Sequence, residues 1–268
     1  MATELWVRPP AGPARSCVRA LLAFLLPDSC VSCGAPLPVD RSHVCIDCAR
    51  TLIPRPSEVV LPVPPDLDRE CARQMRARYC LEFGGATRAL VHALKYSGRT
   101  SLAPALATLA EATARGLRPS PSVLVHVPLS PVKRRARGFD QSELVAARLA
   151  ALLGIMHVPG LRRVRTNRAQ AVSDRASRLT LGSDAFAPTG RPLRGPVLLV
   201  DDVVTTGATM AAAAHALARS VAAPIFCLAV AGTRSGGASD ARVDASELRE
   251  RPWTRQNAVR SPLAGESG

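Results

Sequence analysis

A chain of 268 residues, of which 47% are hydrophobic, is long enough to bury a sizeable core, so one or two domains are expected. Only 3% of the residues are aromatic, which excludes an aromatic-rich core and leaves Ala, Val and Leu to fill it. The net charge of +14 is almost all arginine, because lysine occurs only at Lys95 and Lys133. This charge fits an anionic partner, such as nucleic acid or pyrophosphate, or a solvated surface shaped by a GC-rich genome.

The first 27 residues are expected to form a flexible terminus and a short helix. Three prolines fall within residues 1–13, and residues 14–26 are expected to be helical. The apolar segment 20–26 follows two arginines and faintly resembles a signal peptide, but no clear A-x-A cleavage site follows it. No apolar run approaches the roughly 20 residues that a membrane-spanning helix needs. We therefore expect a cytoplasmic protein without a membrane span.

Residues 28–53 carry the spacing of a four-thiolate metal site. Two Cys-x2-Cys pairs are separated by 11 residues, and each pair can present two sulfurs to one ion. Four protein ligands leave no position for water, so this spacing predicts a structural zinc ribbon with His43 as a bystander. A redox pair is the alternative, and it is disfavoured because neither pair is expected to open a helix after a strand. The expected ligands are Cys30, Cys33, Cys45 and Cys48. The other cysteines, expected to be ordinary buried thiols, are Cys17, Cys71, Cys80 and Cys227.

Residues 54–70 hold five prolines and are expected to be a linker or an extended crossing. From residue 71 to 232, continuously apolar runs alternate with helical patterns, which predicts a mostly parallel α/β sheet with helices on both faces. Residues 233–268 are polar and aperiodic, which is typical of a disordered tail. The elements expected in the α/β domain are helices over 85–96, 101–115, 140–153 and 207–219 and strands over 122–128, 197–203 and 224–231.

The strand that begins at residue 197 runs into two acidic residues. Asp201 and Asp202 follow four apolar residues and lie at the carboxyl end of a parallel strand, where such sheets bind ligands. Two adjacent carboxylates repel each other unless hydroxyls, cations or other donors compensate. The segment 205–209 then offers hydroxyls, a glycine and backbone amides at a helix start, which suit a phosphate. The combination points to a ribose 5-phosphate, whereas a strand end with a capping threonine leaves the paired acids unexplained.

A second candidate loop, residues 127–143, follows the strand 122–128 and precedes a helix. The start of that helix has a capping-box pattern, Asp140 with Glu143. Basic side chains followed by a glycine suit a pyrophosphate, and a solvated basic loop is the alternative. These residues are Lys133, Arg134, Arg135, Arg137 and Gly138.

Residues 197–209 resemble, position by position, the phosphoribosyl pyrophosphate (PRPP) signature of the type I phosphoribosyltransferases. This resemblance implies that Asp201 and Asp202 hold the 2′ and 3′ hydroxyls of ribose and are the residues on which catalysis depends. It also implies that Mg²⁺ accompanies PRPP, bound largely through the oxygens of the ligand, as suits a hard cation. The residues implied to hold the 5′-phosphate are Thr205, Thr206, Gly207, Ala208 and Thr209.

The wider combination of motifs resembles the ComF family, whose members join an amino-terminal zinc ribbon to a phosphoribosyltransferase-like domain. The matching segments span residues 20–231 and are PDSCVSCG, CIDCARTL, LKYSGR, VPLSPVKRRARGFDQSE, RTNRAQAVSDRASR and VDDVVTTGATM. The chain departs from the family pattern at Asp140 and Arg178, where asparagine is usual, and lacks a glycine before the last strand. The resemblance implies a pyrophosphate loop at Arg137 and Gly138, a basic hood at Lys95 and Arg99, and a flexible lid around Gln170.

The sequence leaves two functions open. In one, the chain is an enzyme in which a nitrogen nucleophile attacks C1 of the PRPP ribose while Mg-pyrophosphate leaves. In the other, it is a non-catalytic module that senses PRPP or binds single-stranded DNA. The resemblance implies a role in DNA uptake and natural competence beside helicase and recombination proteins, although scarce aromatics disfavour a sequence-tolerant groove for single-stranded DNA.

Overall fold

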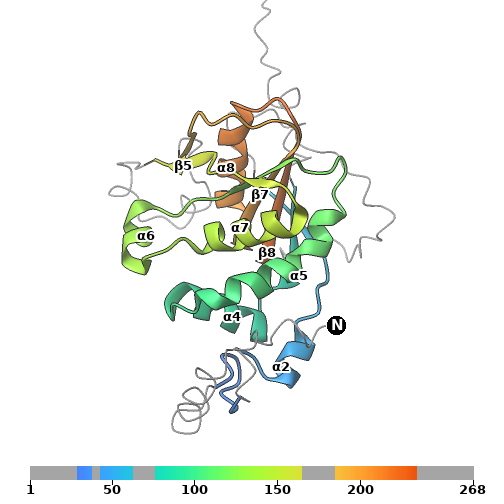
Figure 1. Cartoon of the computed structure of the whole chain (residues 1–268), viewed down its shortest axis with the longest axis vertical. Coiled ribbons are helices and arrows are strands. Elements are labelled where there is room, and N and C mark those ends of the chain that lie inside the picture. Colours follow the sequence, from blue (N-terminus) through green and yellow to red (C-terminus); the bar gives the residue numbers. More distant parts are fainter. Residues whose placement is uncertain (1–28, 38–42, 63–75, 165–184, 234–268) are drawn as a thin grey trace, which may run out of the picture.

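The computed structural model describes residues 29–37, 43–62, 76–164 and 185–233 (Figure 1). Within these segments one sheet has the strand order β1-β2-β8-β7-β3-β4, and β1, at its edge, is antiparallel to β2 while the other neighbours are parallel. The expected amino-terminal helix, the lid around Gln170 and the tail from residue 234 lie outside the described residues. The strands of the sheet are β1 (Ser57–Val60), β2 (Arg76–Glu82), β3 (Val123–His126), β4 (Met156–His157), β7 (Val197–Val204) and β8 (Ile225–Gly232).

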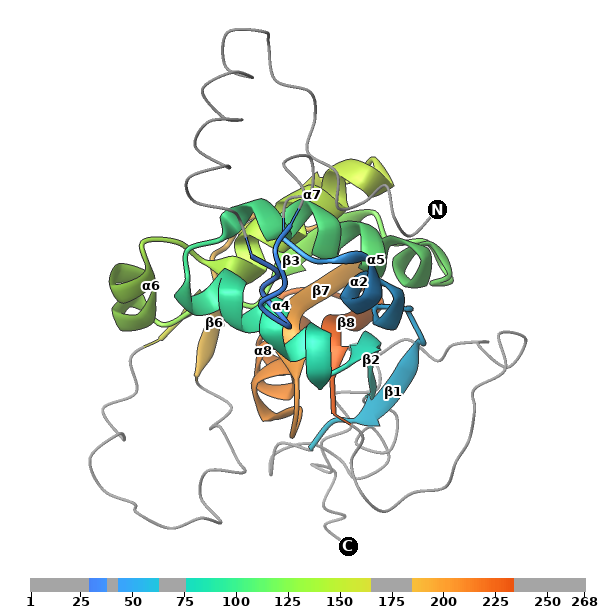
Figure 2. The ribbon, with the colours of Figure 1, turned by 90° about the horizontal axis from the view of Figure 1, so that it is seen from below.

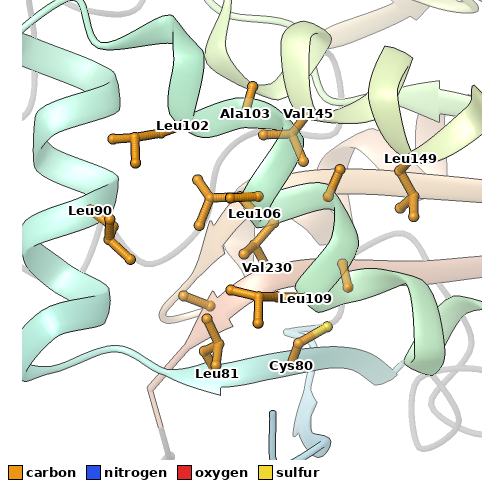
Figure 3. Packing of buried hydrophobic residues seen from close by; sticks show 14 of the residues in the cluster. Cys80, Leu81, Leu90, Leu102, Ala103, Leu106, Leu109, Val145, Leu149 and Val230 are labelled. Carbon is orange, nitrogen blue, oxygen red and sulfur yellow. The ribbon is translucent and has the colours of Figure 1, made fainter. Parts of the chain in front are cut away.

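Helices cover both faces of the sheet (Figure 2). On one face α4, α5 and α7 share an apolar core with the strands, seen in Figure 3 around Leu106 and Val230. On the other face, α8 and the antiparallel pair β5 (Leu161–Arg163) and β6 (Phe186–Pro188) form a second core. The helices are α2 (Ile46–Thr51), α4 (Gly85–Tyr96), η2 (Thr100–Leu102), α5 (Ala103–Arg115), α6 (Pro131–Arg137), α7 (Gln141–Leu153) and α8 (Ala208–Ala218).

The predicted mostly parallel α/β sheet with helices on both faces is confirmed. The central strand β8 is buried along its whole length, and β7 is buried over its first four residues. Burial on both faces explains why these strands are continuously apolar rather than alternating. The helix expected over 85–96 coincides with α4, and the other helices and strands expected after it are present at nearly the expected bounds.

The strands β1 and β2 were hidden by charged residues in their sequences. β1 lies within the segment 54–70, which was expected to be a linker or crossing, and prolines near both of its ends suit an edge strand. Glu58 lies opposite Arg78 across the two strands, and its Oε1 is 3.2 Å from Arg78 Nε. This ion pair explains why charged residues lie within these two strands. Because the strands lack a continuous apolar pattern, the sequence did not predict them.

The cysteine segment packs on the sheet domain beside α4 and α5 (Figure 1). The ring of His43 is held by Ser101, whose Oγ lies 2.8 Å from His43 Nε2. The division into a ribbon over 28–53 and a domain over 71–232 stays a prediction. The apolar residues through which this segment joins the core of Leu94 and Leu102 are Cys30, Leu37, Val44, Ala49 and Leu52.

Candidate functional site

Two neighbouring parallel strands bring both candidate loops to the carboxyl end of the sheet. β3 and β7 are neighbours, with His126 opposite Val200, so the segments that follow them leave the sheet side by side. The hydroxyl of Ser142, in the first turn of α7, donates a hydrogen bond of 2.8 Å to Oδ1 of Asp201. This bond joins the loop 127–143 to the acidic couplet.

Asp202 is paired with a cation from α4. Its side chain is 5% exposed, and its Oδ2 lies 2.9 Å from Nζ of Lys95. The contact is an ion pair by distance, although its angles fall short of a directed hydrogen bond. Because an unpaired carboxylate at this depth would be strongly destabilising, Lys95 explains how the buried strand can carry a charge.

Asp201 has a different environment from its neighbour. Its Oδ1 accepts hydrogen bonds from the Ser142 hydroxyl and from the backbone amide of Asp202, both of 2.8 Å. Burial, and then the charge of Asp202, raise the pKa of the Asp201 carboxyl above its ordinary value, against the lowering effect of Ser142, the amide and Lys95. Asp201 keeps part of its surface in contact with solvent, which limits this rise. The couplet therefore combines one carboxylate that is paired with a cation and one that is held by neutral donors.

The turn after β7 presents backbone amides at a helix start. Gly207 is the N-cap of α8 with φ +75°, a conformation that glycine adopts without strain. A Cβ at this position would lie 2.6 Å from Cδ2 of Leu61 and 3.1 Å from Cδ of Pro62, so a larger residue would also have to displace the Leu61 side chain. Gly207 has no side chain with which to cap α8, and Thr205 and Thr206 are exposed. Amides and hydroxyls in this arrangement can bind a phosphate.

The basic segment expected to be a loop contains a short helix, α6. Ser130 begins it by accepting a hydrogen bond from a backbone amide, Pro131 occupies its first turn, and Gly138, at φ +78°, ends it. Serine followed by proline is a start signal for a helix, and it could have revealed α6 from the sequence. Within α6, Arg137 is fixed by Gln141, whose Oε1 accepts a hydrogen bond of 2.8 Å from Nη1.

The end of α4 reaches both halves of the site. Lys95 pairs with Asp202, and the next residue, Tyr96, has its ring centre 4.9 Å from the guanidinium carbon of Arg137. Arg99, expected beside Lys95 in a basic hood, follows the end of the helix and donates its backbone amide to α4. The structure therefore joins Lys95 to the acidic couplet and Arg137 to the same end of α4, whereas Arg99 is tied to that helix through its backbone.

Asp140 organises the start of α7. Its Oδ1 accepts hydrogen bonds from the amides of Ser142 and Glu143, as the capping pattern predicts, and its Oδ2 accepts one of 2.7 Å from the amide of Leu129. One carboxylate thus fixes both the chain leaving β3 and the turn that carries Ser142. Ser142 and Tyr96 are site residues that the sequence motifs did not predict. Both lie within those motifs, but a serine or tyrosine there gives no sign of its partner.

The four cysteines of the amino-terminal pairs form one cluster. Their Sγ atoms all lie within 4.8 Å of one another, and those of Cys33 and Cys45 are 3.6 Å apart. Sulfurs of a tetrahedral zinc site are about 3.8 Å apart for Zn–S bonds near 2.3 Å. Burial raises the pKa of Cys30, but backbone hydrogen bonds at Cys33, Cys45 and Ser32 together lower it to about 6. Against the lowering effect of a Ser32 hydrogen bond, burial and the neighbouring sulfurs raise the pKa of Cys48 to about 12, so metal binding would have to displace its proton. The cluster fits a zinc ion whose four positions are filled by protein.

The remaining cysteines play no part in this cluster among the described residues. Cys80 and Cys227 are free and buried, as expected for ordinary thiols, and burial raises the pKa of each. Cys17 and Cys71 lie outside the described residues. None of the helices in the described segments is both long and apolar enough to span a bilayer.

The fold and site define a mixed α/β protein with a four-cysteine cluster that precedes the sheet in the chain. Two acids, a basic loop and an amide-lined turn lie together at the carboxyl end of its parallel strands. The chain is 33% identical over 225 residues to the DNA utilization protein YhgH of Salmonella typhi, across 76% of this chain and 97% of that protein. It is 28% identical over 228 residues to YhgH of Escherichia coli K12, with the same coverage. The chain belongs to the family of these DNA utilization proteins.

Other comparisons add little to this family assignment. No family model matches the chain. Among solved structures, the orotate phosphoribosyltransferase of Aeropyrum pernix is 21% identical over 59% of this chain and 66% of its own, with a TM-score of 0.30. A similarity this weak supports no assignment of activity.

Proposed function

We propose that the protein is a ComF-like phosphoribosyltransferase that binds PRPP with Mg²⁺ and transfers the phosphoribosyl group to a nitrogen acceptor. The observation that carries this proposal is the acidic couplet of β7, which directly precedes the turn at Gly207. Ser142 and Lys95 bind the two acids, so the repulsion between them is compensated before a ligand arrives. Acids for sugar hydroxyls beside amides for a phosphate match the two ends of a ribose 5-phosphate.

In this proposal the ribose and the 5′-phosphate of PRPP contact different segments at the carboxyl end of the sheet. The ribose 2′ and 3′ hydroxyls donate to Asp201 and Asp202, and the 5′-phosphate accepts from the amides and hydroxyls of residues 205–209. Carboxylate oxygens suit a hard cation, and Mg²⁺ would supply charge neutralisation to the pyrophosphate. When the sugar hydroxyls donate to Asp202, the Lys95 ammonium stays beside that carboxylate and also faces the pyrophosphate that Arg137 binds.

The reaction then breaks one bond and forms one. The nitrogen of the acceptor donates its lone pair to C1 of ribose, and the C1–O bond breaks with its electrons going to pyrophosphate. The protein orients the ring through the couplet and stabilises the departing negative charge through Lys95, Arg137, Gly138 and Arg99. In this mechanism none of these side chains forms a covalent bond to the substrate.

A second candidate function rests on the relatives. They are named for DNA utilization, and this chain carries a net charge of +14, with the exposed cations Lys133, Arg134 and Arg135 on one helix. The alternative is an accessory protein that senses PRPP or binds single-stranded DNA during DNA uptake and competence, with helicase or recombination partners. A thiolate metal site suits the reducing cytoplasm in which either function would operate.

The substitution Asp202→Asn separates the two functions. Titration calorimetry with PRPP and Mg²⁺ should give binding by the wild type and about ten-fold or weaker binding by Asp202→Asn, because the loss of one charge-assisted hydrogen bond costs about 1.5–3 kcal/mol. Glu111→Gln, far from the couplet on α5, should bind like the wild type. Pyrophosphate release with a panel of nitrogen bases then tests transfer. Absence of heat with millimolar PRPP, together with salt-sensitive retention of single-stranded DNA by both proteins, would favour the DNA-binding alternative. Binding of PRPP without pyrophosphate release would favour the PRPP sensor.

A further inference from the structure

Tyr96 exposes an aromatic ring beside the candidate site. The residue is 68% exposed, whereas the other tyrosine and phenylalanine side chains of the described segments are buried or partly buried. It ends α4, immediately after the lysine that pairs with Asp202. An exposed ring at this position contributes little to the core, so its contacts outside the core indicate its role.

Two contacts fix the orientation of the ring. His92, one helical turn earlier, meets it edge to face with ring centres 5.4 Å apart at 63°. The guanidinium carbon of Arg137 lies over its face, 4.9 Å from the centre, within the range of a cation–π interaction. The Gln141 amide oxygen binds the same guanidinium at 2.8 Å. Arg137 is therefore held from two elements, α4 and α7.

The manner in which Arg137 is held differs from that of its neighbour Arg134. Arg134 pairs with the carboxylate of Glu143 at 3.0 Å, which offsets its charge. Among the described residues, a ring face and an amide oxygen hold Arg137 and no carboxylate pairs with it, so its orientation is restricted while its charge is not offset. A cation held in this way is prepared for an anion that arrives from solution.

We propose that Tyr96 is a positioning residue, which holds the Arg137 guanidinium ready for the pyrophosphate of PRPP. The inference rests on the proposed function, because it takes the pyrophosphate to be the anion that Arg137 meets. It adds that the last turn of α4 serves both ends of the ligand: Lys95 at the couplet and Tyr96 at the basic loop. The hydroxyl of Tyr96 has no part in this role, since the ring face makes the contact.

The test compares two ligands that differ in the pyrophosphate. Calorimetry with PRPP and Mg²⁺ should show about five-fold weaker binding by Tyr96→Leu, the loss expected of one cation–π contact. Ribose 5-phosphate, which lacks the pyrophosphate, should bind Tyr96→Leu and the wild type equally. Tyr96→Phe, which keeps the ring, should restore PRPP binding. Met156→Ala removes an equally exposed apolar side chain from β4, where Met156 pairs with the first residue of β3, and should bind both ligands like the wild type.

A double-mutant cycle shows whether Tyr96 acts through Arg137. In the Arg137→Met background, Tyr96→Leu should cause no additional loss of PRPP affinity. Equal losses for both ligands, or an undiminished loss in that background, would overturn the positioning role while leaving PRPP binding intact. A wild-type protein that binds no PRPP would overturn the proposed function, and this inference with it.

Discussion

Asp201 and Asp202 are adjacent on β7, yet they meet different partners. Asp202 faces the ammonium of Lys95, whereas Asp201 accepts hydrogen bonds from a hydroxyl and an amide. A neutral donor stabilises a carboxylate less than a cation does, so the two side chains are held by interactions of different strength. Two aspartates that are adjacent in the sequence therefore have different interaction partners in the folded protein.

Replacing Asp201 by asparagine should flatten the pH dependence of stability. The folded-state pKa of Asp201 is raised, so the folded protein holds this proton more tightly than the unfolded chain. The resulting stability is fully present below the unfolded pKa of about 4 and is lost as the pH rises through the folded value. The wild-type free energy of unfolding should therefore fall over that window, and that of Asp201→Asn should fall less.

Urea unfolding at a series of pH values measures this difference. Glu111→Gln should keep the slope of the wild type, because Glu111 lies on α5 in an exposed pair with Arg115. An equally steep slope in Asp201→Asn would show that another group carries the pH dependence.

At the scale of elements, the sequence predicts best where one physical cause dominates. β7 and β8 are buried on both faces, and α7 has a side-chain cap at Asp140, so an apolar run and a capping pattern were sufficient to find them. β1 and β2 were missed because Glu58 and Arg78 pair across the strands, and such a pair depends on a register that no local pattern encodes. The acidic couplet and basic loop could be found as motifs, but their link through Ser142 depends on the packing of α7 against β7.

The junction of β7 and α8 depends on Gly207 for two separate reasons. Its φ of +75° strains any other residue, and a Cβ would overlap Leu61, which follows β1. Gly207→Ala should cost about 1 kcal/mol for the left-handed backbone and about 2 kcal/mol more for the overlap. Gly190→Ala is the matched control, because its φ is +80° but nothing lies within 4 Å of the added carbon.

Chemical denaturation of both glycine variants separates the two costs. The excess loss in Gly207→Ala over Gly190→Ala measures the contact with Leu61. Equal losses would mean that the segment after β1 yields to the added methyl group.

At the scale of the whole molecule, the cysteine segment and the sheet domain share a core. Val44 and Leu52 from the first belong to the same cluster as Leu94 and Leu102 from the second, and the pair His43–Ser101 spans the two. Because apolar surface on α4 and α5 is covered by this segment, the order of the cysteine cluster contributes to the stability of the sheet domain.

Loss of the metal should therefore destabilise the entire protein. We expect one zinc per chain, and we expect Cys48→Ser to lose it and to lower Tm by about 5–10 °C in a single transition. Cys227→Ser alters a buried thiol outside the cluster and should keep its zinc. Metal analysis and differential scanning calorimetry measure the two effects. A separate, early transition with an unchanged main transition would show that the two parts unfold independently.

The contact between Lys95 and Asp202 has a consequence for electrostatic steering. If PRPP binds as proposed, its pyrophosphate meets an ammonium group that is already paired with Asp202. The ligand therefore gains less new opposite charge at this site than the excess of arginine suggests. The affinity for PRPP should accordingly respond to ionic strength less steeply than the overall charge of the molecule implies.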